Sequence, residues 1–223
     1  MKISIITAVW KRPQVFEMFA KGIKALNVDI RVIVAGSEGE TSRKMVESHG
    51  FEYIEVANSP LSNKMNAASL AAKGSDYVIC MGSDDVIQPI LMQQYLLWMG
   101  QGYDFIGSTD YYFYDLKTKK AAYWGGYINR GRRGETVGAG RIFSKKLMNR
   151  CDWKLWSDGV DKGLDSTSKL NIKGRIKKFR LKQLGMYAID IKSDENITKF
   201  ELWPNTTYID AKLIEDSFSH IFE

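Results

Sequence analysis

The sequence of 223 residues is poor in the residues that build disulfide frameworks and zinc sites, with only two cysteines and two histidines. Cys80 lies in an apolar run and Cys151 in a basic segment, so we expect two free thiols and a reducing, cytoplasmic location. Two histidines disfavour a histidine-rich zinc site. No apolar run reaches the length that spans a bilayer and no basic-then-apolar signal opens the sequence, so we expect no transmembrane segment.

Acidic residues are scarce in one segment, residues 130–182, which holds 16 Lys and Arg against 5 Asp and Glu. The rest of the chain holds 16 against 21, although the whole chain carries a net charge of +6. A basic segment on a mildly acidic body predicts a polyanionic partner, which could be nucleic acid, an anionic membrane surface or a phosphorylated substrate. The alternative is a solvated lysine-rich face, which would not explain why the charges are segregated.

Two carboxylates follow directly after a strand that the sequence predicts to be buried. Tyr77–Met81 is a short apolar run of β-formers, typical of a strand covered on both faces. Gly82 and Ser83 end this run and Asp84 and Asp85 follow them, ahead of Pro89, where a helix over 90–99 would begin. Open α/β sheets bind ligands at the carboxyl ends of their strands, and Mg²⁺-type ions are held by one or two carboxylates plus substrate phosphates. We therefore predict a metal–diphosphate site; the alternative is that one of the two acids caps the helix.

The hydrophobic pattern alternates between strands and helices over the first hundred residues. We expect strands at 2–10, 30–35, 51–56 and 77–81, and helices at 16–26, 41–49, 64–73 and 90–99. After this part we expect strands at 103–107, 109–116, 121–124 and 187–191, a strand that turns into a helix at 142–148, and a polar, aromatic tail after 201. Crossovers of this length suit parallel pairing, so the pattern predicts a single α/β domain with a Rossmann-type, mostly parallel sheet flanked by helices and a basic C-terminal elaboration.

Five segments, in this order along the chain, resemble the motifs of family 2 glycosyltransferases of the GT-A fold. They are the opening strand and its Thr-x-x-Arg-Pro loop at 4–13, the second strand at 31–37, the helix start at 61–67, the place of the Asp-x-Asp metal motif at 81–85, and the place of the catalytic acidic pair at 163–165. The resemblance is good over residues 1–100 and thins out after them. It implies a nucleotide-sugar-binding half at 1–100 and an acceptor-binding and catalytic-base half at 101–223.

Three positions depart from the family pattern. The apolar pair 34–35 stands where the family has two Asp residues that contact the nucleobase, with Glu38 near enough to substitute. Gly82 replaces the first Asp of the metal motif, which leaves Asp84 as the direct ligand. Lys64 stands where the family usually has Arg, and it keeps the charge but loses the bidentate fork.

The resemblance implies a role for most of the residues in these motifs. Asp84 would hold Mn²⁺ or Mg²⁺, with Asp85 as a second ligand or ribose contact. Asp165 would be the general base of an inverting transfer, with Asp161 one helical turn earlier as the fallback, although both could simply form the acidic face of a helix. The donor, which would most simply be a UDP-sugar, would be bound by Thr7, Ala8, Trp10, Arg12, Gly36, Glu38, Lys64, Asn66, Gly82, Ser83 and Asp84.

Aromatic residues are interleaved with basic ones in the second half, a composition that suits contact with phosphates and stacking on bases. The residues concerned are Trp124, Tyr127, Arg130, Arg132, Arg133, Lys177 and Arg180. One hypothesis is therefore a DNA glycosyltransferase of the kind that some bacteriophages carry, acting on a hydroxymethylated base that is extruded from the duplex. A second hypothesis is a transferase of polysaccharide or lipid-linked glycan, whose basic face would meet anionic lipid or acidic glycan. A third is a non-catalytic protein with the same fold that binds nucleotides or nucleic acid.

Overall fold

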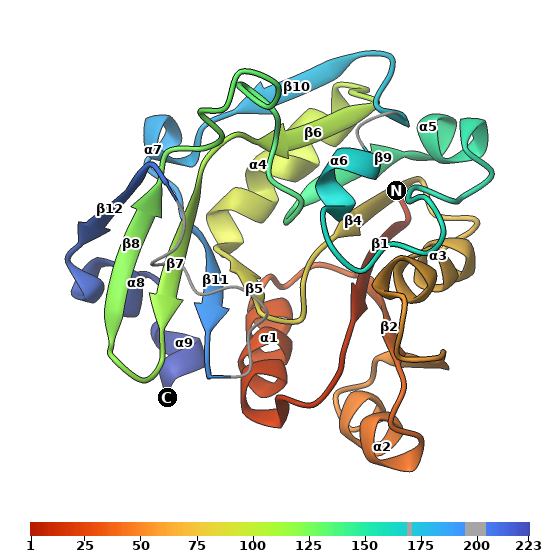
Figure 1. The fold of residues 1–223 in the computed structure, drawn as a ribbon, viewed down its shortest axis with the longest axis horizontal. Helices are drawn as coiled ribbons and strands as arrows, with labels where there is room; N and C mark the ends of the chain where they lie inside the picture. Colours follow the sequence, from red (N-terminus) through yellow and green to blue (C-terminus); the bar gives the residue numbers. More distant parts are fainter. Residues whose placement is uncertain (169–170, 195–203) are drawn as a thin grey trace.

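The computed structural model describes residues 1–168, 171–194 and 204–223, and within these ranges it forms two β-sheets with helices packed around them (Figure 1). The larger sheet has the strand order β10 (Ile176–Phe179), β6 (Phe105–Ser108), β9 (Arg141–Ser144), β4 (Tyr77–Cys80), β1 (Ile3–Ala8), β2 (Arg31–Gly36) and β3 (Glu52–Glu55). The smaller sheet has the order β12 (Thr206–Ile209), β8 (Lys120–Trp124), β7 (Tyr111–Asp115), β11 (Ala188–Lys192) and β5 (Asp85–Ile87).

The helices connect these strands and cover both faces of the larger sheet. They are α1 (Pro13–Ala25), α2 (Glu40–Glu47), α3 (Leu61–Ala71), α4 (Pro89–Gly100), α5 (Lys145–Arg150), α6 (Leu164–Ser168), α7 (Leu181–Leu184), α8 (Ala211–Ser217) and α9 (Ser219–Phe222). Within the described ranges, none of these helices combines the length and the apolar character that crossing a lipid bilayer requires.

The larger sheet is mostly parallel, as the strand–helix alternation predicted. β1 pairs in parallel with β2 and with β4, and β2 pairs in parallel with β3. β9 runs antiparallel to both of its neighbours, β4 and β6. The predicted α/β fold is therefore confirmed, and the carboxyl ends of β1, β2 and β4 all point to the same side of the sheet.

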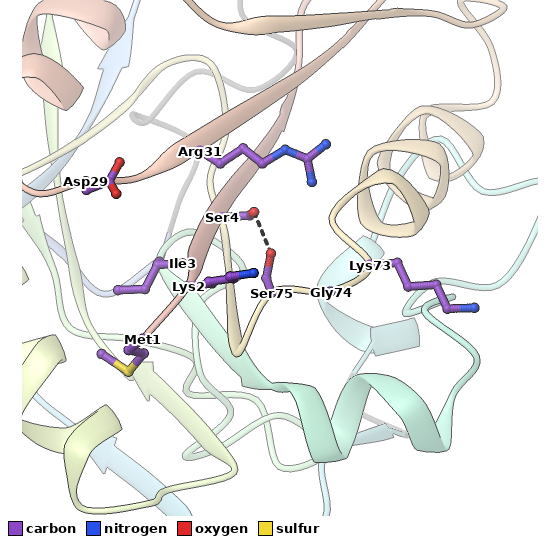
Figure 2. Close-up of a pocket in the computed structure, with 9 residues that line it drawn as sticks. All are labelled: Met1, Lys2, Ile3, Ser4, Asp29, Arg31, Lys73, Gly74 and Ser75. Carbon is purple, nitrogen blue, oxygen red and sulfur yellow. Dashed lines mark hydrogen bonds between the residues drawn. The ribbon is translucent and has the colours of Figure 1, made fainter.

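The opposite side, at the amino ends of the strands, carries a hollow of about 350 Å³ (Figure 2). The Arg31 guanidinium at this hollow is already bound to the Glu52 carboxylate, at 2.7 Å, and to the Ala71 carbonyl, at 2.9 Å. The hydroxyls of Ser4 and Ser75 close its floor with a hydrogen bond of 2.7 Å. Parallel sheets bind ligands at the carboxyl ends of their strands, so we do not expect the active site in this hollow.

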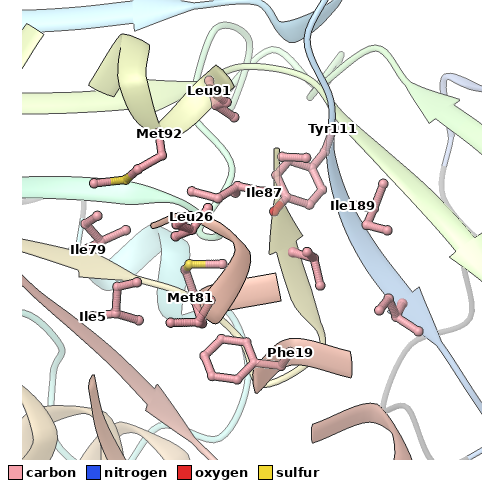
Figure 3. Packing of buried hydrophobic residues seen from close by; sticks show 14 of the residues in the cluster. Ile5, Phe19, Leu26, Ile79, Met81, Ile87, Leu91, Met92, Tyr111 and Ile189 are labelled. Atoms are coloured by element: carbon pink, nitrogen blue, oxygen red, sulfur yellow. The ribbon is translucent and has the colours of Figure 1, made fainter. Parts of the chain in front are cut away.

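Both faces of β1 are buried, which explains why its sequence is an unbroken apolar run. Ile5 faces the cluster that includes α1 and α4, and Ile6 faces a second cluster that includes α3 and α5. The first cluster continues from Ile79 of β4 to Ile87 of β5 and Ile189 of β11, so the two sheets share one core (Figure 3). Full burial of a side chain such as these contributes about 1.5–3 kcal/mol.

Several parts of the fold differ from the sequence prediction, and among them β10 and α7 lie in a segment for which no strand or helix was expected. Residues 85–87 form β5, where no strand was expected, because they pair with β11 about a hundred positions later in the chain. Residues 204–223 of the expected polar tail form β12, α8 and α9, and β12 pairs antiparallel with β8. Residues 201–203 of that predicted tail lie outside the described ranges.

Candidate functional site

Three carboxylates come together at the carboxyl end of β4. Asp84 and Asp85 follow that strand, and Asp190 of β11 offers a carboxylate oxygen that lies within 4.8 Å of an oxygen of each. The antiparallel pairing of β5 with β11 sets Asp85 directly opposite Asp190, so strand pairing brings the third acid to the cluster. An all-carboxylate set of oxygens suits hard cations such as Mg²⁺ and Mn²⁺.

Gly82 allows the two adjacent acids to turn toward one place. Its backbone N–H donates a hydrogen bond to Asp85 Oδ2 at 2.5 Å. A Cβ atom at this position would lie 2.4 Å from Asp84 Oδ1 and 2.9 Å from Asp85 Oδ2. The carboxylates therefore fill the space that a side chain at position 82 would need, which is a local physical reason for the missing first Asp of the metal motif.

Neither acid caps the helix that follows them. α4 begins at Pro89, and its N-cap residue Gln88 forms no side-chain capping hydrogen bond. Asp85 is buried inside β5 and bonded to Gly82, and Asp84 is bonded to Arg12. The capping alternative is therefore wrong.

Burial and mutual repulsion make this cluster electrostatically unfavourable. Burial raises the pKa of Asp85 well above its ordinary value, and the charges of Asp84 and Asp190 raise it further. Burial also raises the pKa of Asp190 to about 6, although the Lys192 ammonium 2.5 Å from its Oδ2 opposes the shift. A divalent cation would remove this repulsion by accepting the carboxylates as ligands.

Arg12 reaches the cluster from the loop between β1 and α1. Its guanidinium donates to Asp84 Oδ2 at 2.7 Å and to Ser83 Oγ at 3.1 Å. Lys11 and Arg12 have φ angles of 56° and 61°, in the left-handed region, which costs on the order of 1–3 kcal/mol per residue. The Lys11 N–H donates to Glu38 Oε2 at 2.7 Å, so the strained loop is tied down next to the predicted nucleobase contact.

Lys64 is almost fully buried, at 1% exposure, and its ammonium holds three loops together. It donates to the Val9 carbonyl at 3.2 Å, to Ser37 Oγ at 2.7 Å and to Asn58 Oδ1 at 2.9 Å. Burial lowers its pKa. These three acceptors follow β1, β2 and β3, so the side chain shapes the predicted donor pocket even before any contact with a donor.

The other predicted donor residues divide into exposed and buried ones. Trp10 is 46% exposed and offers a ring face at the end of β1, whereas Thr7 is fully buried. Gly36 lies against the Tyr53 ring, where a Cβ would come within 2.4 Å of a ring carbon. Asn66 is buried and bonds the Trp156 backbone twice, at 2.9 Å and 3.2 Å, so it links α3 to the segment before α6. Ala8 is half-buried at the end of β1.

Asp165 lies in the first turn of α6, beside β9, the strand that pairs antiparallel with β4. Its Oδ2 accepts hydrogen bonds from the Tyr127 hydroxyl at 2.9 Å and from the Gly138 N–H at 3.0 Å. The Arg141 guanidinium donates to its carbonyl at 2.9 Å, and Arg141 pairs with Cys80 in the β4–β9 register. This chain of contacts ties Asp165 to the strand whose end carries the acidic cluster.

Asp161 lies elsewhere than predicted. α6 begins at Leu164, so Asp161 is not one turn earlier on the same helix. Its carboxylate instead accepts from the Leu61 N–H at 2.8 Å and from the Ser59 hydroxyl at 2.9 Å, at the start of α3. The fallback placement of Asp161 on the helix of Asp165 is therefore wrong.

The aromatic residues of the predicted acceptor surface are covered. Trp124 is 3% exposed and its Nε1 donates to the Pro204 carbonyl at 2.9 Å, so its ring cannot stack on an extruded base in this conformation. The Arg132 guanidinium lies 3.6 Å from the centre of the Tyr127 ring and is also bonded to Glu135 at 2.7 Å. Tyr127 is thus an internal contact between Asp165 and Arg132.

The basic residues of that surface lie on neighbouring segments. The Lys178 ammonium donates to the Gly134 carbonyl at 2.7 Å, and Arg180 donates to the Gly125 carbonyl at 3.3 Å. These bonds join β10 and its following residue to the loop 125–134. Of the predicted acceptor residues, Arg130, Arg133 and Arg180 are exposed, and Lys177 is half-buried over the Trp98 ring.

Sequence reasoning missed Asp190, Lys192 and Tyr111. The strand Ala188–Lys192 was predicted, but its two charged residues were not singled out. A charged side chain within an apolar strand is a signal, since buried charges are rare unless they are paired or bind a metal.

Comparison with known proteins agrees with this fold. The model of a family described as glycosyl transferase family 2 matches residues 4–156. The structure of S. aureus TarS 1-349 is similar with a TM-score of 0.61 and 15% identity, over 86% of this chain and 60% of that one. The mannosyltransferase PcManGT from Pyrobaculum calidifontis, solved in complex with GDP-Man and Mn²⁺, is similar with a TM-score of 0.59 and 13% identity, over 88% of this chain and 58% of that one. No curated protein matches the sequence. At these identities the structural likeness concerns the fold, and this chain spans little more than half of either relative.

Proposed function

Because the chain belongs to glycosyl transferase family 2 and has a GT-A fold, we propose that it transfers a sugar from a nucleotide-sugar donor to an acceptor hydroxyl. The observation that carries this proposal is the cluster of Asp84, Asp85 and Asp190 at the carboxyl end of a parallel strand. That position is where α/β sheets bind nucleotides, and an acidic cluster there is suited to a cation that is shared with a diphosphate.

The residues present fit a bound Mn²⁺ or Mg²⁺. The donor atoms are carboxylate oxygens, and Asp190 Oδ1 is buried with no hydrogen-bond partner within residues 1–168, 171–194 and 204–223. Asp84 and Asp85 would be the ligands from the metal motif. When bound, the cation would act as a Lewis acid that stabilises the leaving nucleoside diphosphate. The Mn²⁺ complex of the related mannosyltransferase supports the same choice of metal.

Arg12 and Trp10 would bind the rest of the donor. The Arg12 guanidinium already lies at Asp84, so it is within reach of phosphate oxygens that share the cation. The exposed Trp10 ring would stack on the base, with the Lys11 ammonium 4.6 Å from the ring centre. Glu38 replaces the missing acidic pair as the polar contact to the nucleobase. A UDP-sugar is the simplest donor for this pocket.

Asp165 would be the general base of an inverting transfer. The acceptor oxygen forms a bond to the anomeric carbon, the bond from that carbon to the diphosphate oxygen breaks with its electron pair going to the diphosphate, and the acceptor proton goes to the Asp165 carboxylate. Its hydrogen bonds from Tyr127 and Gly138 fix its orientation. General-base catalysis by a positioned carboxylate contributes on the order of 10²–10⁴-fold to the rate.

We propose that the acceptor is polyanionic, with hydroxymethylated DNA as the first candidate and an acidic or lipid-linked glycan as the alternative. The exposed side chains of Arg130, Arg133 and Arg180 support phosphate contacts. Binding to duplex DNA should then weaken steeply as salt increases, because each phosphate contact releases a counterion. A gel-shift experiment in which DNA does not bind at low salt would remove the DNA acceptor and leave the glycan.

The central experiment is a thermal-shift screen of nucleotide sugars with and without Mn²⁺, followed by an assay of donor hydrolysis. A ligand at 100 times its Kd should stabilise the protein by about 2.7 kcal/mol. Asp84→Asn should abolish the Mn²⁺-dependent shift and the hydrolysis, whereas the matched change of the exposed Asp29 to Asn should leave both intact. Donor binding without any hydrolysis or transfer would instead favour a non-catalytic binding protein.

A further inference from the structure

Asp190 and Lys192 lie beyond the residues that the family match covers, 4–156. They are two positions apart on β11, so strand geometry directs their side chains to the same face. The Lys192 Nζ lies 2.5 Å from Asp190 Oδ2, and Lys192 is only 6% exposed. Its ammonium also lies 5.2 Å from the centre of the Phe113 ring, so it is held inside the protein next to the acidic cluster.

Two buried oxygens beside this ion pair have no hydrogen-bond partner among the residues that the structure describes. They are Asp190 Oδ1 and the hydroxyl oxygen of Tyr111, a residue that is 4% exposed. Burial raises the pKa of the Tyr111 hydroxyl, and the charges of Asp85, Tyr95, Asp190 and Asp84 raise it further. Figure 3 shows the Tyr111 ring beside Ile87 of β5. Buried polar atoms are nearly always paired, so two such atoms at one acidic cluster point to a missing cationic ligand.

We propose that Asp190 is a third carboxylate ligand of the donor-bound cation and that Lys192 is its internal counter-ion. This inference rests on the glycosyltransferase function proposed above, and it assigns to the smaller sheet a part of the cation site. Lys192 keeps Asp190 paired while the site is empty, and it repels the cation once that binds. The Tyr111 hydroxyl, which has no partner among the described residues, would donate to a carboxylate oxygen of the cluster once the cation is bound and would orient it.

The buried Lys192 ammonium should make cation binding depend on the nucleoside diphosphate. A buried ammonium beside the site weakens the binding of Mn²⁺ alone, whereas the negative charge of a nucleoside diphosphate offsets that repulsion. The protein should therefore bind Mn²⁺ much more tightly in the presence of uridine diphosphate than in its absence.

A change of metal preference tests ligation directly. In the full chain, Asp190→Cys should weaken Mn²⁺ binding and create a Cd²⁺ site with a thiolate-to-cadmium absorption band, because thiolates prefer soft metals. Asp194→Cys, four positions further on at an exposed carboxylate, should leave Mn²⁺ binding unchanged and add no such band at the cluster. Wild-type protein controls for Cys80 and Cys151. A purely structural or electrostatic role for Asp190 would not produce the cadmium signature.

Mn²⁺ affinity, measured from the electron paramagnetic resonance of free Mn²⁺, gives the second readout. Asp190→Asn should weaken Mn²⁺ binding by at least about tenfold. Because this change leaves the Lys192 ammonium buried without its partner, the double variant Asp190→Asn/Lys192→Met, which removes both buried charges together, is measured beside it in case the single variant does not fold. If Asp84→Asn abolishes Mn²⁺ binding while Asp190→Cys shows no cadmium band and Asp190→Asn binds normally, this inference is overturned and the proposed function stands. If the wild type binds no Mn²⁺ with or without uridine diphosphate, both fail.

Discussion

A single methyl group at Gly82 should disable the cation site while it leaves the fold in place. The Cβ of Gly82→Ala would lie 2.4 Å from Asp84 Oδ1, and ordinary contacts begin at 3.4 Å, so that oxygen would have to withdraw by about 1 Å. Forced displacements of this kind in a packed site cost about 1–3 kcal/mol. At 1.4 kcal/mol for each factor of ten, the affinity for Mn²⁺ should fall roughly 5- to 140-fold.

The assay is Mn²⁺ titration by calorimetry, with urea unfolding of the same samples. Gly100→Ala is the matched control, because a Cβ at the end of α4 meets no atom within 4 Å. Gly82→Asp, which restores the acid that the family motif has at this position, should weaken binding even more than Gly82→Ala. Tighter binding by Gly82→Asp would refute the packing argument and show that the site merely lacks a ligand.

Three further perturbations test other parts of the structure. Lys64→Met should lower the free energy of unfolding by about 1–3 kcal/mol with or without donor, because it leaves buried acceptors unpaired; an effect confined to donor affinity in a titration would show a phosphate contact instead. Asp165→Asn should lower turnover on the order of 10²–10⁴-fold with nearly unchanged donor Kd, whereas Asp161→Asn should mainly reduce stability; wild-type turnover by Asp165→Asn would reject the base assignment. Burial lowers the pKa of His49, so the unfolded chain takes up its proton more readily and the free energy of unfolding should fall between pH 7 and pH 5. His49→Gln should flatten that fall in urea titrations at the two pH values, and an unchanged slope would show that other groups cause it.

Most of the first hundred residues were predictable because their signals are local. β1, β2 and β4 are apolar runs, α1 has a periodic apolar face, and the parallel pairing of neighbouring strands follows from the strand–helix alternation. β5 and β12 were not predictable in this way. Each is short, and each becomes a strand only because a segment far away in the sequence, β11 or β8, supplies its hydrogen bonds.

The residues of the site also divide into those that a local sequence pattern predicts and those that depend on distant strand pairing. Asp84 could be predicted because it follows an obvious strand within a known motif. Asp190 could not, since its place opposite Asp85 depends on the β5–β11 register, which no local pattern encodes. The prediction for Trp124 was wrong for the converse reason: an aromatic residue in a basic region was expected at the surface, but β12 and the Pro204 carbonyl cover it.

β5 has only three residues, yet it makes the loop of acids part of the smaller sheet while β4 belongs to the larger one. The Ile191 N–H donates to the Asp84 carbonyl at 2.7 Å, so the backbone of the first acid is fastened across the junction as well. The three carboxylates therefore move with the smaller sheet, and any rocking of one sheet against the other would change their distance from Arg12, which follows β1 of the larger sheet. A cation bound together with a diphosphate that contacts Arg12 should therefore hold the two sheets together, and slower hydrogen exchange of the Ile191 amide would report it.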